Sequence, residues 1–297
     1  THIQFAHCYK QQDGWVDVLA RFKRGGGKLY DLEFLEDANG RRVAAFGWHA
    51  GFAGAALGLL ALAEQVQGRQ LGKQTMYPNE SSLLEQTRAA VETIRAHRSD
   101  GRVTSLVIGA LGRCGRGAID CLEKSGFKAD EIVRWDVQET SAKSGPYQEI
   151  ANSDLFINCI YLSKKIPPFI NRDLLAAAGS QRRLGMIVDV SCDTTNPNNP
   201  IPVYSVNTTF EKPTVRVDGV DNLEVISIDH LPTLLPRESS EAFSHDLLPS
   251  LLQLPLIQGD DGPDALAHDH AEGEGAVWAR AEKLFRHHLA EAEKNGA

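Results

Sequence analysis

The stretch Leu106-Val-Ile-Gly-Ala-Leu-Gly-Arg-Cys-Gly-Arg-Gly-Ala118 decides the fold of this chain. Its aliphatic start predicts a buried strand, and Gly109, Gly112 and Gly115 predict a tight turn that leads into a helix. The first turn of a helix offers backbone N–H groups to a phosphate. Because the spacing is GxxGxxG and not the standard GxGxxG, the turn alone leaves two interpretations open, a dinucleotide site and a plain glycine-rich crossover.

The segment Ile132-Val-Arg-Trp-Asp136 favours the dinucleotide. It predicts a second strand that ends in an acid about 20 residues beyond the glycines, where a carboxylate can bind a ribose 2′-hydroxyl. A negative charge here suits NAD and disfavours NADP, because the 2′-phosphate of NADP would meet the carboxylate of Asp136. The turn and the acid together therefore predict an NAD site.

Aliphatic strands alternate with helical patterns through the middle of the chain. The expected strands are Ser105–Ile108, Glu131–Trp135, Leu155–Ile160, Met186–Val190 and Leu223–Ile228. Amphipathic helices are expected at Gly115–Ser125 and at Ser81–Arg98, where Ser81 or Ser82 would supply the N-cap. Buried strands joined by helices predict an α/β fold with a parallel sheet covered on both faces. The irregular segment Cys192–Pro202 would lie at the carboxyl edge of that sheet, where such folds bind ligands.

The first 47 residues contain three strand-like pieces, Ile3–Phe5, Leu29–Leu35 and Arg42–Phe46, without an opening crossover. They predict the second half of a domain whose beginning is absent. The apolar run Phe46–Leu62 follows, rich in glycine and alanine and interrupted by His49. We expect it to be too short to span a bilayer and to form a close-packed internal helix.

Composition excludes several classes of protein. The net charge of −8 argues against nucleic-acid and anionic-membrane partners. Five widely spaced cysteines without a CxxC motif suit a reducing compartment, and the start of the chain resembles no signal peptide, so we expect a cytoplasmic protein. Residues 258–274 predict an acidic, solvated insertion before a closing helix at Ala276–Lys294. His268 and His270 lack a third ligand at helical spacing, so no metal site is expected.

Several strings resemble one enzyme family. They are, in chain order, Phe5-Ala-His-Cys-Tyr-Lys10, Leu29-Tyr-Asp-Leu-Glu-Phe-Leu35, Gly40-Arg-Arg-Val-Ala-Ala-Phe-Gly47, Ala50-Gly-Phe-Ala-Gly-Ala-Ala-Leu57, Ile108-Gly-Ala-Leu-Gly-Arg-Cys-Gly115, Ile157-Asn-Cys-Ile-Tyr-Leu-Ser163, Val188-Asp-Val-Ser191 and Ser227-Ile-Asp-His-Leu-Pro232. In this order they resemble the fungal NAD-dependent, L-lysine-forming saccharopine dehydrogenases. The resemblance implies oxidation of saccharopine by NAD and water to lysine and 2-oxoglutarate. It also implies two Rossmann-like domains with parallel sheets and an active-site cleft between them, with residues 1–47 and 232–297 in the first domain and 48–231 in the NAD domain.

The resemblance assigns roles to individual residues. His7 matches the catalytic acid/base of the family, and Glu33 and Asp229 match the acids that tune its site. The substrate-binding positions are Gln12, Arg42, Phe46, Val188, Asp189 and Val190. The cofactor-binding positions are Arg41, Gly112, Arg113, Asp136, Thr140, Tyr161, Val188, Ile228, Asp229, His230 and Leu231. The residue types alone leave ordinary interpretations open: a structural histidine, a solvated arginine pair after the Asn39-Gly40 turn, a surface amide, a core aromatic and buried ion pairs.

The family also has a catalytic lysine and a substrate-binding arginine in a preceding stretch, and neither position exists in this sequence. We therefore expect the chain alone to be weakly active or inactive. An NAD-binding remnant without turnover is one alternative. An alanine dehydrogenase-like oxidoreductase is another, and the Phe-Ala-His-Cys-Tyr string and the Arg41-Arg42 pair disfavour it.

Two cysteines fall near the expected cofactor edge of the sheet. Cys114 lies in Gly-Arg-Cys-Gly, and Cys159 lies in Asn-Cys-Ile-Tyr. We hypothesise that they lie close enough for a regulatory disulfide that would block NAD. A Cα separation above about 7 Å would exclude that bridge without backbone movement.

Overall fold

The computed structural model describes residues 1–192, 194, 196–257, 273 and 275–297. The chain forms two compact units, unit 1 from 1–45 and 240–297, and unit 2 from 46–239. The second boundary therefore falls after residue 239 and not after 231 as predicted. The physical reason is a short 3-10 helix, η4 (Leu231–Leu234), whose leucines pack into the core of unit 2 together with Leu235.

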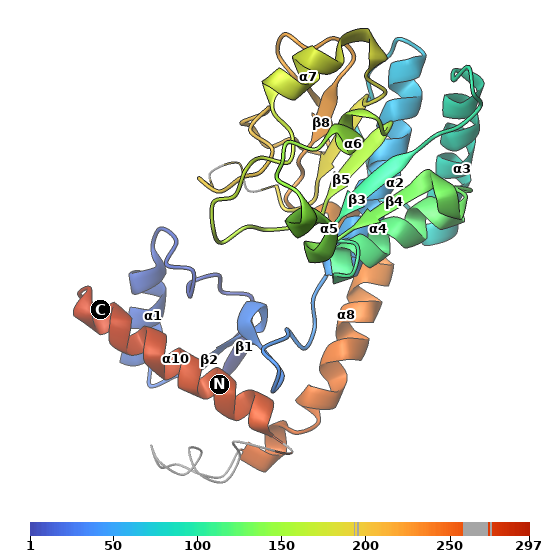
Figure 1. Cartoon of the computed structure of the whole chain (residues 1–297). Helices are drawn as coiled ribbons and strands as arrows, with labels where there is room; N and C mark the ends of the chain where they lie inside the picture. The colour runs from blue at the N-terminus through green and yellow to red at the C-terminus, as the bar shows by residue number, and fades with distance from the viewer. Residues whose placement is uncertain (193, 195, 258–272, 274) are drawn as a thin grey trace. The chain divides into compact units, whose positions relative to one another are not determined.

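Unit 2 is built on one six-stranded sheet with the order β4-β3-β5-β6-β8-β7 (Figure 1). The strands are β3 (Ser105–Ile108), β4 (Ile132–Trp135), β5 (Leu155–Asn158), β6 (Met186–Asp189), β7 (Val215–Arg216) and β8 (Glu224–Ile226). All neighbours are parallel except the edge pair β7 and β8. Ile108 pairs with both Trp135 and Asn158, so three strands end at the same level.

Helices cover both faces of this sheet. Alternate strand residues point to opposite faces, so Val107 and Ile157 lie in one apolar cluster while Leu106 and Phe156 lie in another. One face is covered by α2 (Gly47–Val66), α3 (Glu80–Ala96) and α4 (Arg113–Lys124), and the other by α6 (Gln148–Ala151) and α7 (Arg172–Ala178). The short helix α5 (Val137–Ala142) follows β4 and has no buried residue. The predicted doubly wound α/β fold is confirmed. The N-cap of α3 is Asn79, whose Oδ1 accepts a hydrogen bond from Ser82 N, and not a serine as predicted.

Helix α2 packs against α4 backbone to backbone. A Cβ atom added at Gly51 would lie 1.8 Å from the carbonyl oxygen of Cys114, and one at Gly117 would lie 1.9 Å from that of Trp48. Both distances are far below any van der Waals contact, so only glycine fits at either position. The same helix meets β6, where a Cβ at Gly58 would lie 2.7 Å from Val188 Cγ2.

We predict that Gly117→Ala destabilises unit 2. In an exposed helix this change stabilises by up to about 1 kcal/mol, but here the added methyl group has to push α4 away from α2, at a cost of roughly 1–3 kcal/mol or more. Chemical denaturation of both proteins measures the difference. Gly72→Ala is the matched control, because nothing lies within 4 Å of a Cβ at that position. Equal stabilities for the two variants would contradict the prediction.

The apolar run that opens unit 2 is longer than predicted. Helix α2 has 20 residues and is, by length and composition, the one helix of the described residues that could cross a membrane. The prediction that it is too short is therefore wrong. The prediction of a close-packed internal helix agrees with its burial, because 72% of its most apolar window is buried by the rest of the protein.

Unit 1 contains a two-stranded parallel sheet, β1 (His2–Gln4) and β2 (Leu29–Asp31), joined by α1 (Trp15–Arg24). Helix α1 is the crossover between these two strands, and the prediction that an opening crossover before the first strand is absent stays a prediction. Helix α10 (Ala276–Lys294) packs on α1 and β2. Helix α8 (Pro236–Leu251) begins in unit 2 and continues into unit 1 from residue 240, and η5 (Leu254–Ile257) completes unit 1. The predicted strand at Arg42–Phe46 is reduced to one bridge between Arg42 and Glu36. The reason is a tight turn, in which the Asp37 carboxylate accepts hydrogen bonds from the N–H groups of Asn39 and Arg41.

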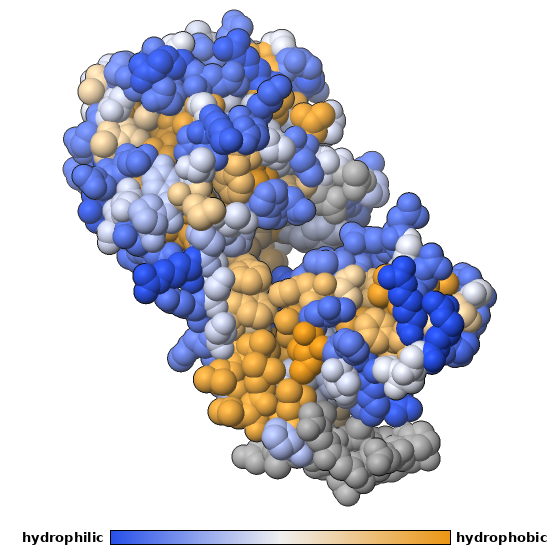
Figure 2. Space-filling model, turned by 180° about the vertical axis from the view of Figure 1, so that it is seen from behind, coloured by the Kyte–Doolittle hydropathy of each residue, from blue (hydrophilic) through white to orange (hydrophobic). Residues whose placement is uncertain are grey.

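The small sheet leaves apolar side chains on the surface of unit 1. Phe5, Leu248 and Leu252 are exposed by 38%, 51% and 71%, and apolar residues gather on this unit in the view from behind (Figure 2). A two-stranded sheet is marginally stable by itself, so α1 and α10 have to supply most of its stability. The predicted insertion 258–274, with His268 and His270, lies outside the described residues except for Gly273.

A buried carboxylate joins α10 to the sheet of unit 1. Glu282 is 2% exposed; it accepts a hydrogen bond from Tyr30 Oη at 2.9 Å and pairs with Lys28 and Arg286 at 2.9 and 2.6 Å. Burial alone would raise the pKa of Glu282, but the bonds from Arg286, Lys28 and Tyr30 hold it below its ordinary value of 4.5. The ionised carboxylate therefore stabilises the folded state.

We predict that Glu282→Gln lowers the free energy of unfolding at pH 7 by roughly 1.5–3 kcal/mol, as expected for hydrogen bonds to a charged group. A lowered pKa contributes stability above 4.5, and this contribution disappears as the pH falls through the folded-state value. Denaturation between pH 7 and pH 3 should therefore show the two proteins converging in acid. A difference that is constant with pH would contradict the ionic role.

Candidate functional site

The glycine turn lies between β3 and α4 at the carboxyl edge of the sheet. Gly109 has φ +88°, a conformation that favours glycine, and a Cβ there would lie 2.9 Å from Ile160 Cγ1. A Cβ at Gly115 would lie 2.1 Å from the Gly109 carbonyl oxygen, so the helix can begin directly against the turn. Gly112 is the N-cap and Arg113 the first residue of α4. The positive end of this helix dipole suits an anionic group.

Asp136 connects this turn to the neighbouring strand. Its Oδ2 accepts a hydrogen bond from Leu111 N and its Oδ1 accepts one from Val137 N, both at 2.9 Å. Each carboxylate oxygen has a second lone pair, so a ribose hydroxyl can still bind there. Leu111, Val137 and Tyr161 are exposed by 70%, 67% and 63%, which supplies apolar surface beyond the ends of β3, β4 and β5. The residues present therefore fit an NAD molecule.

The other predicted cofactor positions divide into exposed and buried side chains. Thr140 lies on α5, where its Oγ1 donates a hydrogen bond to the Asp136 carbonyl at 2.8 Å. Arg113, Asp229 and His230 are exposed, whereas Ile228 and Leu231 belong to the apolar core. A contact from these two to a ligand has to come from their backbone. The structure thus brings the glycine turn, Asp136 and Thr140 together.

A buried polar network, which the sequence analysis missed, surrounds Asp189 at the end of β6. Its carboxylate accepts hydrogen bonds from Tyr204 Oη and Ser191 Oγ, both at 2.6 Å, and from Asn158 Nδ2 at 3.0 Å. Burial and the adjacent Asp189 carboxylate raise the pKa of Tyr204, which keeps its phenol protonated. The signal in the sequence was a pair of polar residues, Asn158 and Asp189, that end adjacent apolar strands.

The three residues Val188, Asp189 and Val190 were predicted to bind substrate, and the structure places Asp189 in this network and both valines in or against the apolar core. Asp189 is 1% exposed, and Val188 is fully buried against Gly54 and Gly58 of α2. Val190 packs partly against the same core. The network also fixes the start of the loop after β6, since Cys192 N donates to Asp189 and Cys192 Sγ lies 3.7 Å from Asp229 Oδ1.

In unit 1, His7 lies on a turn after β1 with φ 54°, in the left-handed region. Its ring is exposed and stacks on Phe5 with the centroids 6.1 Å apart. The backbone N–H of His7 donates to the carboxylate of Asp31, which lies at the end of β2 and is 2% exposed. Burial raises the pKa of Asp31, and the N–H groups of Glu33, Ala6 and His7 oppose that increase. Asp31 therefore stabilises the strained turn that presents His7.

Glu33 pairs with two cations. Its Oε1 lies 3.0 Å from Lys10 Nζ, and its Oε2 lies 3.1 Å from Arg42 Nη1. The predicted supporting acid thus orients Arg42, the predicted substrate-binding arginine. Arg41 and Gln12 are exposed in the same unit, and Phe46 is half-buried at the start of unit 2. The cleft expected between the two units stays a prediction.

No disulfide joins Cys114 and Cys159 in the structure, and the regulatory bridge between them stays a hypothesis. Burial, and then the negative charges of Cys114 and Asp189, raise the pKa of Cys159, which disfavours its reactive thiolate. Within the described residues, no group of three or more histidine, cysteine, aspartate or glutamate side chains could hold a metal ion.

Comparison with known proteins identifies the family. No family model matches the chain. Saccharopine dehydrogenase [NAD(+), L-lysine-forming] of Yarrowia lipolytica is 56% identical over 97% of this chain and 74% of its own length. The enzyme of the same name from Schizosaccharomyces pombe is 54% identical over 96% and 74%. This chain belongs to the NAD-dependent, L-lysine-forming saccharopine dehydrogenase family.

More distant relatives agree with the fold. The mitochondrial alpha-aminoadipic semialdehyde synthase of Mus musculus is 26% identical over 86% of this chain but only 35% of its own length. Among solved structures, an L-alanine dehydrogenase matches with a TM-score of 0.57 over 96% of this chain and 74% of its own. Its identity of 16% shows the shared fold alone. The alanine dehydrogenase alternative is therefore not favoured over the fungal family.

We predict that Asp136→Asn weakens NAD binding about tenfold or more, because it removes the charge that accepts the ribose hydroxyl. Calorimetric titration with NAD measures the dissociation constant. Asp130→Asn is the control, since Asp130 is an exposed carboxylate in the short 3-10 helix Ala129–Glu131 that precedes β4, paired only with Arg102 at 2.7 Å among the described residues. Unchanged NAD affinity in Asp136→Asn would contradict the assignment.

Proposed function

We propose that this chain oxidises L-saccharopine with NAD and water to L-lysine and 2-oxoglutarate, the last step of the α-aminoadipate route to lysine. The observation that carries the proposal is the 56% identity to a fungal enzyme of that name over 97% of the chain. The glycine turn and Asp136, which fit NAD, support it. The five free cysteines suit a reducing compartment and support a cytoplasmic location.

When held by the glycine turn and Asp136, NAD would supply the hydride acceptor for oxidation of the glutarate α-carbon that bears the secondary amine. Water then adds to the resulting carbon–nitrogen double bond, and the carbon–nitrogen bond breaks to release lysine. The protein has to move protons in both later steps, and an imidazole can donate and accept them near neutral pH. We assign this role to His7, whose exposed ring stands on the turn that Asp31 supports.

The substrate carries carboxylates that need cationic partners. Arg42 presents a guanidinium fork held by Glu33 at 3.1 Å, and such a fork matches a carboxylate. Gln12 and Phe46 are assigned to substrate contact as well. Gly112, Arg113, Asp136, Thr140 and Tyr161 are assigned to NAD, together with Arg41 from unit 1.

We predict that His7→Gln lowers the turnover of saccharopine by roughly 10²–10⁴-fold, the range for loss of a general acid or base. Its NAD affinity should remain unchanged, because His7 lies outside the glycine turn. NADH formation followed by absorbance measures turnover, and calorimetry measures NAD binding. His2→Gln, an exposed histidine of the same unit, is the control.

Two outcomes would contradict these assignments. Turnover that survives His7→Gln unchanged would remove the assigned role of that residue. The turnover assay uses this chain joined to the family's preceding stretch, which supplies the catalytic lysine and the substrate-binding arginine. Such a protein that binds NAD but forms no NADH with saccharopine would contradict the proposed activity and favour an NAD-binding remnant.

A further inference from the structure

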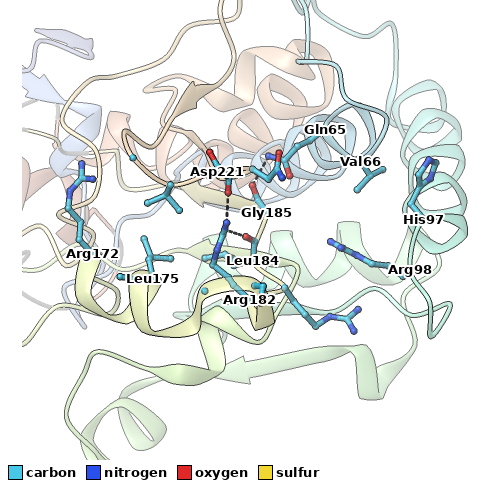
Figure 3. A pocket seen from close by; sticks show the side chains of 17 residues that line it. Gln65, Val66, His97, Arg98, Arg172, Leu175, Arg182, Leu184, Gly185 and Asp221 are labelled. Carbon is cyan, nitrogen blue, oxygen red and sulfur yellow. Dashed lines mark hydrogen bonds between the residues drawn. The ribbon is translucent and has the colours of Figure 1, made fainter.

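The amino edge of the sheet in unit 2 contains a cavity of about 830 Å³. It is lined by four arginines, Arg98, Arg172, Arg182 and Arg183, and by segments that precede β6 and β8. Figure 3 shows Arg98 and Arg172 on opposite sides of the cavity with Arg182 between them. The glycine turn follows the carboxyl end of β3, so this cavity lies at the other edge of the sheet from the NAD site.

Two of the four arginines have carboxylate partners. Arg98 pairs with the buried Asp154 at 2.7 Å. Arg183 pairs with Asp154 at 3.0 Å and with Asp100 at 2.6 Å. These ion pairs join the loop after α3 to the starts of β5 and β6. Arg98 and Arg183 therefore have a structural role that requires no ligand.

The other two arginines donate only to backbone carbonyls. Arg172 donates to Asp218 O, and Arg182 donates to Leu184 O and Asp221 O. Neither has a carboxylate within 4 Å among the described residues, although the Asp221 side chain also lines the cavity and attracts Arg182. Burial lowers the pKa of Arg182, because the charged guanidinium is partly removed from water and its charged form is thereby destabilised.

We infer that this cavity is a second ligand site, which binds a small anion through its phosphate or carboxylate oxygens. Each guanidinium has five N–H donors, and the hydrogen bonds to the backbone carbonyls use one on Arg172 and two on Arg182. An oxyanion would take up the remaining donors and compensate the charge. The cavity volume falls within the range of about 300–1,000 Å³ that small-molecule sites occupy.

The test is calorimetric titration of the whole chain with inorganic phosphate, and separately with succinate, at low ionic strength and with saturating NAD. NAD fills the glycine turn, and comparison of Arg172→Gln with the wild type separates binding in this cavity from binding of a carboxylate at Arg42. We expect binding of at least one anion at one site per chain, and a dissociation constant about tenfold higher in Arg172→Gln. Binding of phosphate alone identifies a phosphorylated ligand, and binding of succinate alone identifies a carboxylate.

Arg88→Gln is the matched control. Arg88 likewise donates to a backbone carbonyl, Lys124 O at 2.9 Å, but lies outside the cavity. Circular dichroism and the melting temperature establish that both variants are folded. Arg172→Gln removes one hydrogen bond to a backbone carbonyl, whereas a change at Arg182 would remove two that join adjacent loops. Absence of binding by both anions, or equal binding by Arg172→Gln and Arg88→Gln, would overturn the inference.

Discussion

Direct contact between the backbones of α2 and α4 is the constraint on which unit 2 depends. Gly51 and Gly117 allow each helix to touch the other at a carbonyl group, where any side chain would collide. Helix α2 also packs on β6 through Gly58, so it fixes α4 relative to the sheet. The glycine turn begins α4, and its position is therefore a result of core packing. An NAD site built on such a contact is preorganised before any ligand arrives.

Charge is arranged differently at the two edges of the sheet. At the carboxyl edge, Asp136 and Asp189 place negative charge among hydrogen-bond donors. At the amino edge, guanidinium groups outnumber the carboxylates that face them. The separation follows from topology, because parallel strands bring all loops of one kind to one edge. A single sheet thus offers two chemically distinct surfaces to ligands.

Local sequence patterns predicted the features that a short stretch of sequence defines by itself. The glycine turn, Asp136 and the parallel strands were predicted because spacing alone encodes them. Features that need distant partners were missed. Asp31 resembles any acid that ends a buried strand, and only folding brings it to the turn of His7. Tyr204 comes from an irregular loop, and nothing in its neighbourhood indicates that it reaches Asp189. The Arg42–Phe46 strand was wrong because the aspartate turn before it ends the pairing.

The two layers of helices on the sheet are unequal in a way that bears on local opening. Helices α2, α3 and α4 have 20, 17 and 12 residues, whereas α6 and α7 on the other face have 4 and 7, and α5 beside them has 6 and buries no residue. Short helices hold few internal hydrogen bonds and depend on packing for their stability. Alternate residues of each strand belong to separate apolar clusters on the two faces of the sheet. The face with the short helices can therefore unfold locally while the other face stays folded. Amide hydrogens of α5–α7 should therefore exchange with solvent earlier than those of α2.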